Sequence, residues 1–162
     1  MEEVLPPQTD TGAGFESTRV RQFTVFLENR VGRLQTLVRA IEEAAGKICG
    51  LSIEESADSA LARIICSDPD ASREAIQAAG FAFSESDLLA VELPKRTRHS
   101  LSSVCSALLA AEINIHYVYP LLVRPRGPAV ALYVEDPTLA AQLLLRKGFT
   151  LLAESDLRRK SE

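Results

Sequence analysis

At 162 residues the chain has the length of one ordinary domain or of two small ones. Hydrophobic residues make up 46% and charged residues 25%, which is typical of a globular rather than a disordered protein. The formal net charge of -4 gives no electrostatic reason to bind nucleic acid or anionic lipid. No apolar stretch approaches the roughly 20 residues of a membrane helix. The first residues lack the basic start and apolar core of a signal peptide, so we expect a cytoplasmic protein.

The cysteines carry no recognisable chemistry. The chain has three cysteines, an odd number: Cys49, Cys66 and Cys105. No pair has the spacing of metal ligands, and each lies in an apolar stretch. This pattern predicts three buried thiols in a reducing compartment. The sequence also lacks a phosphate-binding loop and a nucleophile motif, and it holds only two histidines. We therefore expect no metal, no cofactor and no catalytic residues.

An internal repeat organises the chain. Four landmarks recur in the same order at offsets of 67, 68, 68 and 69 residues, so chance is a poor explanation. They are Gly32-Arg33-Leu34 with His99-Ser100-Leu101, Asp68-Pro69 with Asp136-Pro137, Gly80-Phe81 with Gly148-Phe149, and Glu85-Ser86-Asp87-Leu88 with Glu154-Ser155-Asp156-Leu157. We divide the chain into a disordered leader (1–18), a first unit (19–86), a second unit (87–157) and a tail (158–162).

The first unit alternates between strand and helix patterns. Apolar residues recur at every second position, at helical spacing, or in β-branched runs, and Gly46 and Gly80 end the two helical patterns. In chain order these patterns predict a strand over 20–28, a helix over 34–45, strands over 48–54 and 61–66, a helix over 69–79, and a strand from 81 to 84.

The second unit repeats this order after a gap of about three residues. The predicted elements are a strand over 88–93, a helix over 101–111, strands over 113–123 and 129–135, a helix over 138–147, and a strand over 149–153. Asp68 and Asp136 each precede a proline at a helix start, where an aspartate caps the helix. The order predicts an α+β protein of two tandem ferredoxin-like βαββαβ units. Each has two helices on one face of an antiparallel sheet, and the units pack edge to edge or face to face.

The loop between the first strand and first helix carries a family resemblance. Asn29-Arg30-Val31-Gly32-Arg33-Leu34 resembles the turn D-x-P-G-x-L of ACT domains, with the glycine and leucine matching. In the second unit Arg96 to Leu101 keeps only the leucine. Ala111-Glu112-Ile113-Asn114-Ile115 resembles the family's A-G-I-N-I step into the second strand. The chain thus resembles stand-alone tandem ACT proteins, similar to those described as regulatory subunits of acetolactate synthase.

The resemblance implies a regulatory protein that binds a small ligand, an amino acid, between neighbouring units. Gly32 admits a close backbone approach, the helix start favours a carboxylate, and Asn29 offers both a donor and an acceptor. The implied ligand-binding residues are Asn29, Arg30, Val31, Gly32, Arg33, Leu34, Asn114, Ile115 and His116, with Ile48 to Gly50 as an alternative opposing wall. His99 replaces the glycine in the second loop, so we expect one competent type of site.

Two other functions stay open. The protein could dock on a biosynthetic enzyme without a ligand of its own, and exposed strand edges would also support a homodimer. RNA-binding modules share this strand order but stack bases on sheet aromatics. Here Tyr117, Tyr119 and Tyr133 are the best case for that reading, although packing on a sheet face or at a dimer interface explains them as well.

Overall fold

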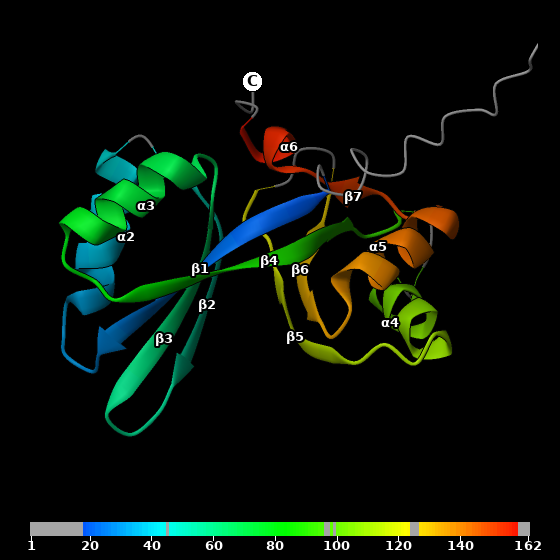
Figure 1. Ribbon diagram of the computed structural model, residues 1–162, viewed down its shortest axis with the longest axis horizontal. Coiled ribbons are helices and arrows are strands. Elements are labelled where there is room, and N and C mark those ends of the chain that lie inside the picture. The colour runs from blue at the N-terminus through cyan, green and yellow to red at the C-terminus, as the bar shows by residue number, and fades with distance from the viewer. Residues whose placement is uncertain (1–17, 45, 96–97, 99, 124–126, 159–162) are drawn as a thin grey trace, which may run out of the picture.

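The computed structural model describes residues 18–44, 46–95, 98, 100–123 and 127–158 (Figure 1). The first unit consists of β1 (Arg19–Glu28), α2 (Arg33–Glu43), β2 (Ile48–Glu55), β3 (Ser59–Cys66), α3 (Pro69–Ala78) and β4 (Phe83–Glu92). The second consists of the end of β4, α4 (Ser100–Ala110), β5 (Ile115–Pro120), β6 (Ala129–Val134), α5 (Pro137–Arg146) and β7 (Leu151–Leu152), followed by α6 (Glu154–Arg158). Two tandem βαββαβ units are thus present, as the repeat predicts.

All strands belong to one antiparallel sheet of order β2-β3-β1-β4-β6-β5, with β7 also paired to β4. The prediction of two separate strands around residue 86 was wrong, because β4 runs without a break from Phe83 to Glu92. Its first part pairs with β1 and its last part with β6 and β7. The boundary expected between residues 86 and 87 therefore falls inside a strand that both units use.

α2 and α3 lie on one outer side and α4 and α5 on the other, with the strands between them, while α6 lies near the middle, close to β7 (Figure 1). Under α2 and α3, Phe23, Leu37 and Ile41 belong to the buried core of the first unit. A second core lies under α4 and α5. A third core lies between the sheet faces opposite to those covered by α2, α3, α4 and α5, and it holds residues of both units, among them Ile65, Tyr119 and Leu157 of α6. The units therefore pack face to face, and burial of this third core stabilises units that would be marginal alone.

The sheet curls until its two edge strands meet. Gly50 of β2 forms an isolated bridge with Leu121, and the backbone N–H of Leu122 donates to the carbonyl of Cys49 at 2.7 Å. A Cβ on Gly50 would lie 3.0 Å from Leu121 Cδ2 and 3.3 Å from the Tyr119 ring. Glycine is thus the residue that lets the edges approach.

Both aspartate caps form as predicted. Asp68 accepts from the backbone N–H of Ala71 at 3.2 Å, and Asp136 accepts from that of Leu139 at 3.0 Å. A proline follows each cap in the first turn of its helix. The capping geometry is therefore the same in both units.

The repeated Glu-Ser-Asp-Leu sequence adopts two different structures. In the first unit Glu85 to Leu88 lie in β4, whereas in the second Glu154 to Leu157 form α6. The closing strand predicted over 149–153 is only Leu151–Leu152. Since β1 already pairs with β4 up to Leu89, β7 finds only Ala90 and Val91 free on that edge. The chain then turns into a short helix, in which Asp156 accepts from the N–H of Ala153 at 2.8 Å.

Candidate functional site

The predicted ligand loop, Asn29 to Leu34, joins β1 to α2 at the surface. The Asn29 amide donates to the Glu55 carboxylate at 3.3 Å, and the Arg30 guanidinium pairs with Glu28 at 2.5 Å. Val31 is fully exposed and Leu34 is also exposed. The loop is therefore tied to its own unit through Asn29 and Arg30.

Gly32 starts α2 in a left-handed conformation, with φ of 88°. Its carbonyl accepts from both the backbone N–H and the hydroxyl of Thr36, each at 3.0 Å. No side chain caps this helix start, in contrast to the aspartates at α3 and α5. An uncapped helix start exposes backbone N–H groups and the positive end of the helix dipole, which favour an anion.

Arg33 is the first residue of α2 and turns back against the core. Its guanidinium lies over the Phe81 ring, 4.5 Å from the ring centre. Both side chains line a hollow of about 340 Å³ between the end of β1, the β2–β3 turn and the α3–β4 turn. Sequence reasoning missed Phe81 as a site residue, although the recurrence of Gly80-Phe81 as Gly148-Phe149 marked this turn.

The segment predicted to oppose the loop lies in the other unit. Asn114 is exposed and its carbonyl accepts from the N–H of Glu135 at 3.0 Å. Ile115 packs against the core of the second unit, and the His116 ring lies 5.5 Å from that of Tyr133. Within the described ranges no hydrogen bond or ion pair joins Asn114 to His116 with Asn29 to Leu34. The prediction that both segments contact one ligand therefore stays a prediction.

The alternative opposing wall, Ile48 to Gly50, is at the junction of the two units. Cys49 and Gly50 are buried, and both contact the second unit at the Leu121 bridge. In the second loop, Arg96, Thr97 and His99 lie outside the described residues. The expectation of one competent type of site, which rests on His99 at the glycine position, therefore stays a prediction.

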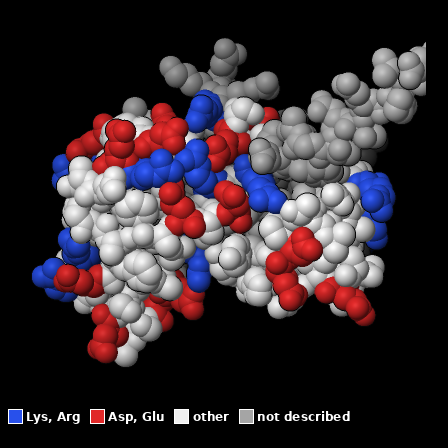
Figure 2. Space-filling model, viewed as in Figure 1, with Lys and Arg blue, Asp and Glu red and all other residues white. Residues whose placement is uncertain are grey.

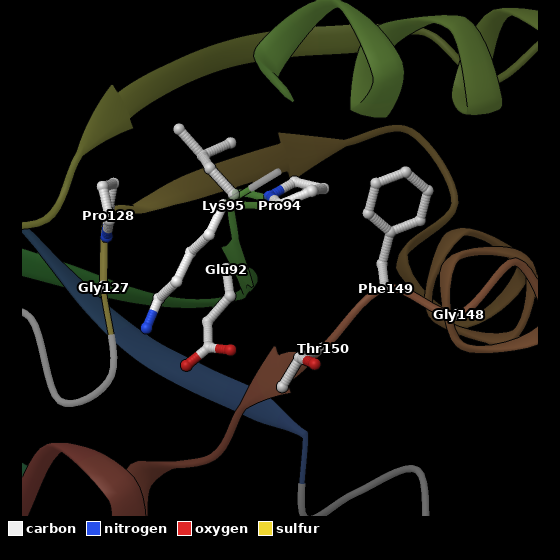
Figure 3. A pocket seen from close by; sticks show the side chains of 9 residues that line it. Glu92, Pro94, Lys95, Gly127, Pro128, Gly148, Phe149 and Thr150 are labelled. Atoms are coloured by element: carbon white, nitrogen blue, oxygen red, sulfur yellow. The ribbon is translucent and has the colours of Figure 1, made fainter. Parts of the chain in front are cut away.

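The second unit has a hollow at the equivalent place. It measures about 320 Å³ and lies between the end of β4, the β5–β6 connection and the α5–β7 turn. Figure 3 shows Lys95 and Glu92 on one side of it and Phe149 on the other. The Lys95 side chain lies so close to Gly127 that a Cβ there would be 2.7 Å from the lysine Cε. Both units thus have a hollow at this place, but the cation that lines it is Arg33 in the first unit and Lys95 in the second.

The three tyrosines lie on the helix-free face between the units. Tyr117 stacks on Tyr133 with ring centres 4.9 Å apart, and the Arg63 guanidinium lies 4.1 Å from the centre of the Tyr117 ring. The buried Gln22 amide donates to the Tyr117 hydroxyl at 2.7 Å and accepts from the Tyr119 hydroxyl at 2.7 Å. Burial raises the pKa of Tyr119. The tyrosines therefore pack a sheet face, as one of the two readings predicted.

Charges of both signs are mixed on one face of the described residues. Figure 2 shows Lys and Arg side chains interspersed with Asp and Glu over the visible face. Among the described residues, no group of three or more His, Cys, Asp or Glu side chains could hold a metal ion, and no helix is long and apolar enough to cross a membrane.

Comparisons with known proteins place the chain in a family. Its sequence matches the family described as an ACT domain pair over residues 18–160. No curated protein matches the sequence. The crystal structure of protein BT0572 from Bacteroides thetaiotaomicron superimposes with a TM-score of 0.80 at 28% identity, covering 88% of this chain and 98% of that one. The ligand-free regulatory subunit of aspartate kinase from Thermus thermophilus has a TM-score of 0.57 at 10% identity, covering 83% and 95%. That of Thermus flavus has a TM-score of 0.53 at 12% identity, covering 79% and 88%. With its two βαββαβ units, the chain belongs to the ACT domain pair family.

Proposed function

We propose that this protein is a non-catalytic regulatory protein that binds an amino acid and thereby controls amino-acid metabolism. The family and the fold support a regulatory role, since two structures with the same fold are regulatory subunits of aspartate kinase. The resemblance to regulatory subunits of acetolactate synthase does not by itself identify the regulated enzyme. A cytoplasmic location is consistent with three cysteines that form no disulfide.

The start of α2 at Gly32 is the observation that carries the proposal. It presents backbone N–H groups without a side-chain cap, and these suit an α-carboxylate. We place the ligand against Asn29 to Leu34. Asn114 to His116 of a second copy would close the site in a homodimer, because these segments are not joined within one chain.

A thermal-shift screen against the twenty standard amino acids tests this function. A ligand at 100 times its Kd stabilises the folded state by about 2.7 kcal/mol. That gain corresponds to a rise in Tm of roughly 5–11 °C for a chain of this size. If no amino acid moves the Tm at millimolar concentration, amino-acid sensing is wrong.

The Gly32→Val variant tests the position of the site. A β-branched residue at φ of 88° costs about 1–3 kcal/mol of stability and covers the helix start. We expect it to abolish the ligand-induced shift. The matched control is Gly148→Val, because Gly148 has φ of 85° and, like Gly32, open space around its Cα. This control introduces the same strain in the other unit and should keep the ligand shift. Equal ligand shifts in both variants would move the site away from Gly32.

A second candidate is a subunit that docks on a biosynthetic enzyme without binding a ligand itself. The neighbouring structures favour it, because one contains the alpha and beta subunits of aspartokinase and has the same fold at a TM-score of 0.53. This candidate predicts no Tm shift with any amino acid. It also predicts co-purification with an enzyme when the tagged chain is expressed in its native host.

A further inference from the structure

Arg33 differs from the other partly buried arginines. The described chain holds five of them: Arg19, Arg21, Arg33, Arg63 and Arg73. Four form ion pairs with carboxylates, namely Arg19 with Asp87, Arg21 with Glu154 and Asp70, Arg63 with Glu54, and Arg73 with Glu85 and Asp70. No carboxylate of the described residues pairs with Arg33. Its Nε is buried without a hydrogen-bond partner.

This arrangement is unfavourable for the free protein. A guanidinium stays charged at every accessible pH and offers five N–H donors, so a partly buried one needs acceptors. The Phe81 face attracts the cation but accepts none of those donors in the guanidinium plane. Arg33 also stands at the first position of α2, where the helix dipole disfavours a positive charge. Stability of the chain alone therefore gives little reason for an arginine here.

The hollow beside Arg33 offers both signs of charge. Arg33 lines it from one element, and the carboxylates of Glu28 and Asp58 line it from two others. Glu28 already pairs with Arg30, whereas Asp58 is exposed in the β2–β3 turn. Its volume of about 340 Å³ is at the lower end of the range for small-molecule pockets. These groups complement a small molecule that carries a carboxylate and an ammonium group.

We propose that Arg33, held over the Phe81 ring, is the receptor for the carboxylate of a small zwitterion, with Asp58 facing its ammonium group. The class of ligand rests on the function proposed above, whereas the assignment of Arg33 and the hollow does not. A planar guanidinium binds a carboxylate through two parallel hydrogen bonds, and the terminal nitrogens of Arg33 are the ones open to such a ligand, since its Nε is buried. The equivalent hollow of the second unit has Lys95 across from Phe149 (Figure 3), and no arginine or lysine of the described residues lies over that ring. The two units are thus unequal at this place too.

The test compares Arg33→Met and Arg33→Lys with the control Arg39→Met. Arg39 lies on the same helix, is exposed, and pairs only with Glu43 at 3.3 Å, so its loss removes the same charge outside the hollow. Calorimetric titration uses the twenty amino acids, their amides, and acetate. Hydrogen bonds to charged groups are worth about 1.5–3 kcal/mol, so Arg33→Met should weaken amino-acid binding roughly tenfold or more. Arg33→Lys should fall between, and Arg39→Met should bind as the wild type does.

Two further readouts separate a receptor from a structural residue. The Tm of ligand-free Arg33→Met should equal or exceed that of the wild type, because methionine keeps the contact with Phe81 and removes an unpaired N–H. The NMR signal of the Arg33 Nε–H group, assigned by its absence in Arg33→Lys, should move with amino acids and acetate but not with the amides.

The outcomes distinguish this inference from the proposed function. If Arg33→Met binds the amino acid as the wild type does, and the Nε–H signal of the wild type does not move, Arg33 is not the carboxylate receptor. Amino-acid sensing would still be supported in that case. Acetate that moves the signal when no amino acid binds supports the receptor and overturns amino-acid sensing. A static signal with every probe, together with a lower Tm for ligand-free Arg33→Met, shows that Arg33 is structural and that the receptor is wrong.

Discussion

The buried Gln22 amide offers a direct measure of how strongly the two units are joined. Gln22 is in β1 of the first unit, and it binds the hydroxyls of Tyr117 and Tyr119 of the second unit. Its amide nitrogen also donates to the hydroxyls of Ser86 and Thr24 within the first unit. Gln22 is 0% exposed and Tyr119 is 6% exposed. The Gln22→Leu substitution nearly conserves side-chain volume but leaves the Tyr119 hydroxyl without its acceptor.

The expected cost follows from burial. A buried hydroxyl left without a partner costs about 1–3 kcal/mol. Tyr117 is partly exposed, so water can replace its lost bond at little cost. We therefore expect Gln22→Leu to lower the free energy of unfolding by about 1–3 kcal/mol and the Tm by roughly 2–12 °C.

A double-mutant cycle with Tyr119→Phe isolates the contact. The single Tyr119→Phe variant leaves the Gln22 oxygen unpaired, whereas the double variant removes both groups together. Urea denaturation should show the double variant at least about 1 kcal/mol more stable than the sum of the single effects predicts. Tyr133→Phe is the control, because the Tyr133 hydroxyl makes no hydrogen bond to Gln22, and its effect should add to that of Gln22→Leu. Additive behaviour of the Tyr119 pair would refute the contact.

Two further predictions concern the helix caps and the thiols. Asp68→Ala and Asp136→Ala should each lower the free energy of unfolding by about 1 kcal/mol, because equivalent caps are lost in the two units. Urea denaturation measures both losses. Clearly unequal losses would contradict the equivalence of the two caps. Burial raises the pKa of Cys49 and of Cys66 to about 11 from an ordinary value near 9. A raised thiol pKa means that the folded state keeps protons that the unfolded state releases. Stability should then be constant below pH 9 and fall between about pH 9 and 11, by up to about 1.4 kcal/mol per pH unit and thiol. Cys49→Ala should reduce that slope in urea denaturations across this pH range, and an unchanged slope would contradict the assignment.

Local signals predicted most of the fold. The repeat, the Asp-Pro helix starts and the alternating strand patterns depend on neighbours in sequence, and they gave the element order correctly. The continuity of β4 could not be read in this way. The run from Ser84 to Asp87 is polar, yet its backbone pairs with β1, and pairing does not depend on apolar side chains.

The repeated Glu-Ser-Asp-Leu sequence shows why local patterns are insufficient. The same four residues are strand in one unit and helix in the other, because β1 occupies the edge of β4 that the second copy would need. Only the tertiary arrangement holds that information. For the same reason the predicted closing strand was too long.

The candidate site also has one part that the local sequence predicts and another that depends on tertiary packing. The loop Asn29 to Leu34 and its glycine were visible in the sequence, because a turn motif is local. The contact of Arg33 with Phe81 joins residues far apart in the chain, and the lack of an ion pair between Arg33 and any carboxylate of the described residues is a property of the packed structure. Whether Asn114 to His116 of a second copy completes the site stays a prediction.

The shared strand β4 has a genetic consequence. The seam of the repeat, between residues 86 and 87, lies inside β4. A fragment ending at residue 86 loses the pairs that Asp87, Leu88 and Leu89 make with β1, whereas a fragment starting at residue 87 keeps the part of β4 that pairs with β6 and β7. We therefore expect a recombination that keeps residues 83–92 in one piece to preserve the protein better than a cut at the seam of the repeat.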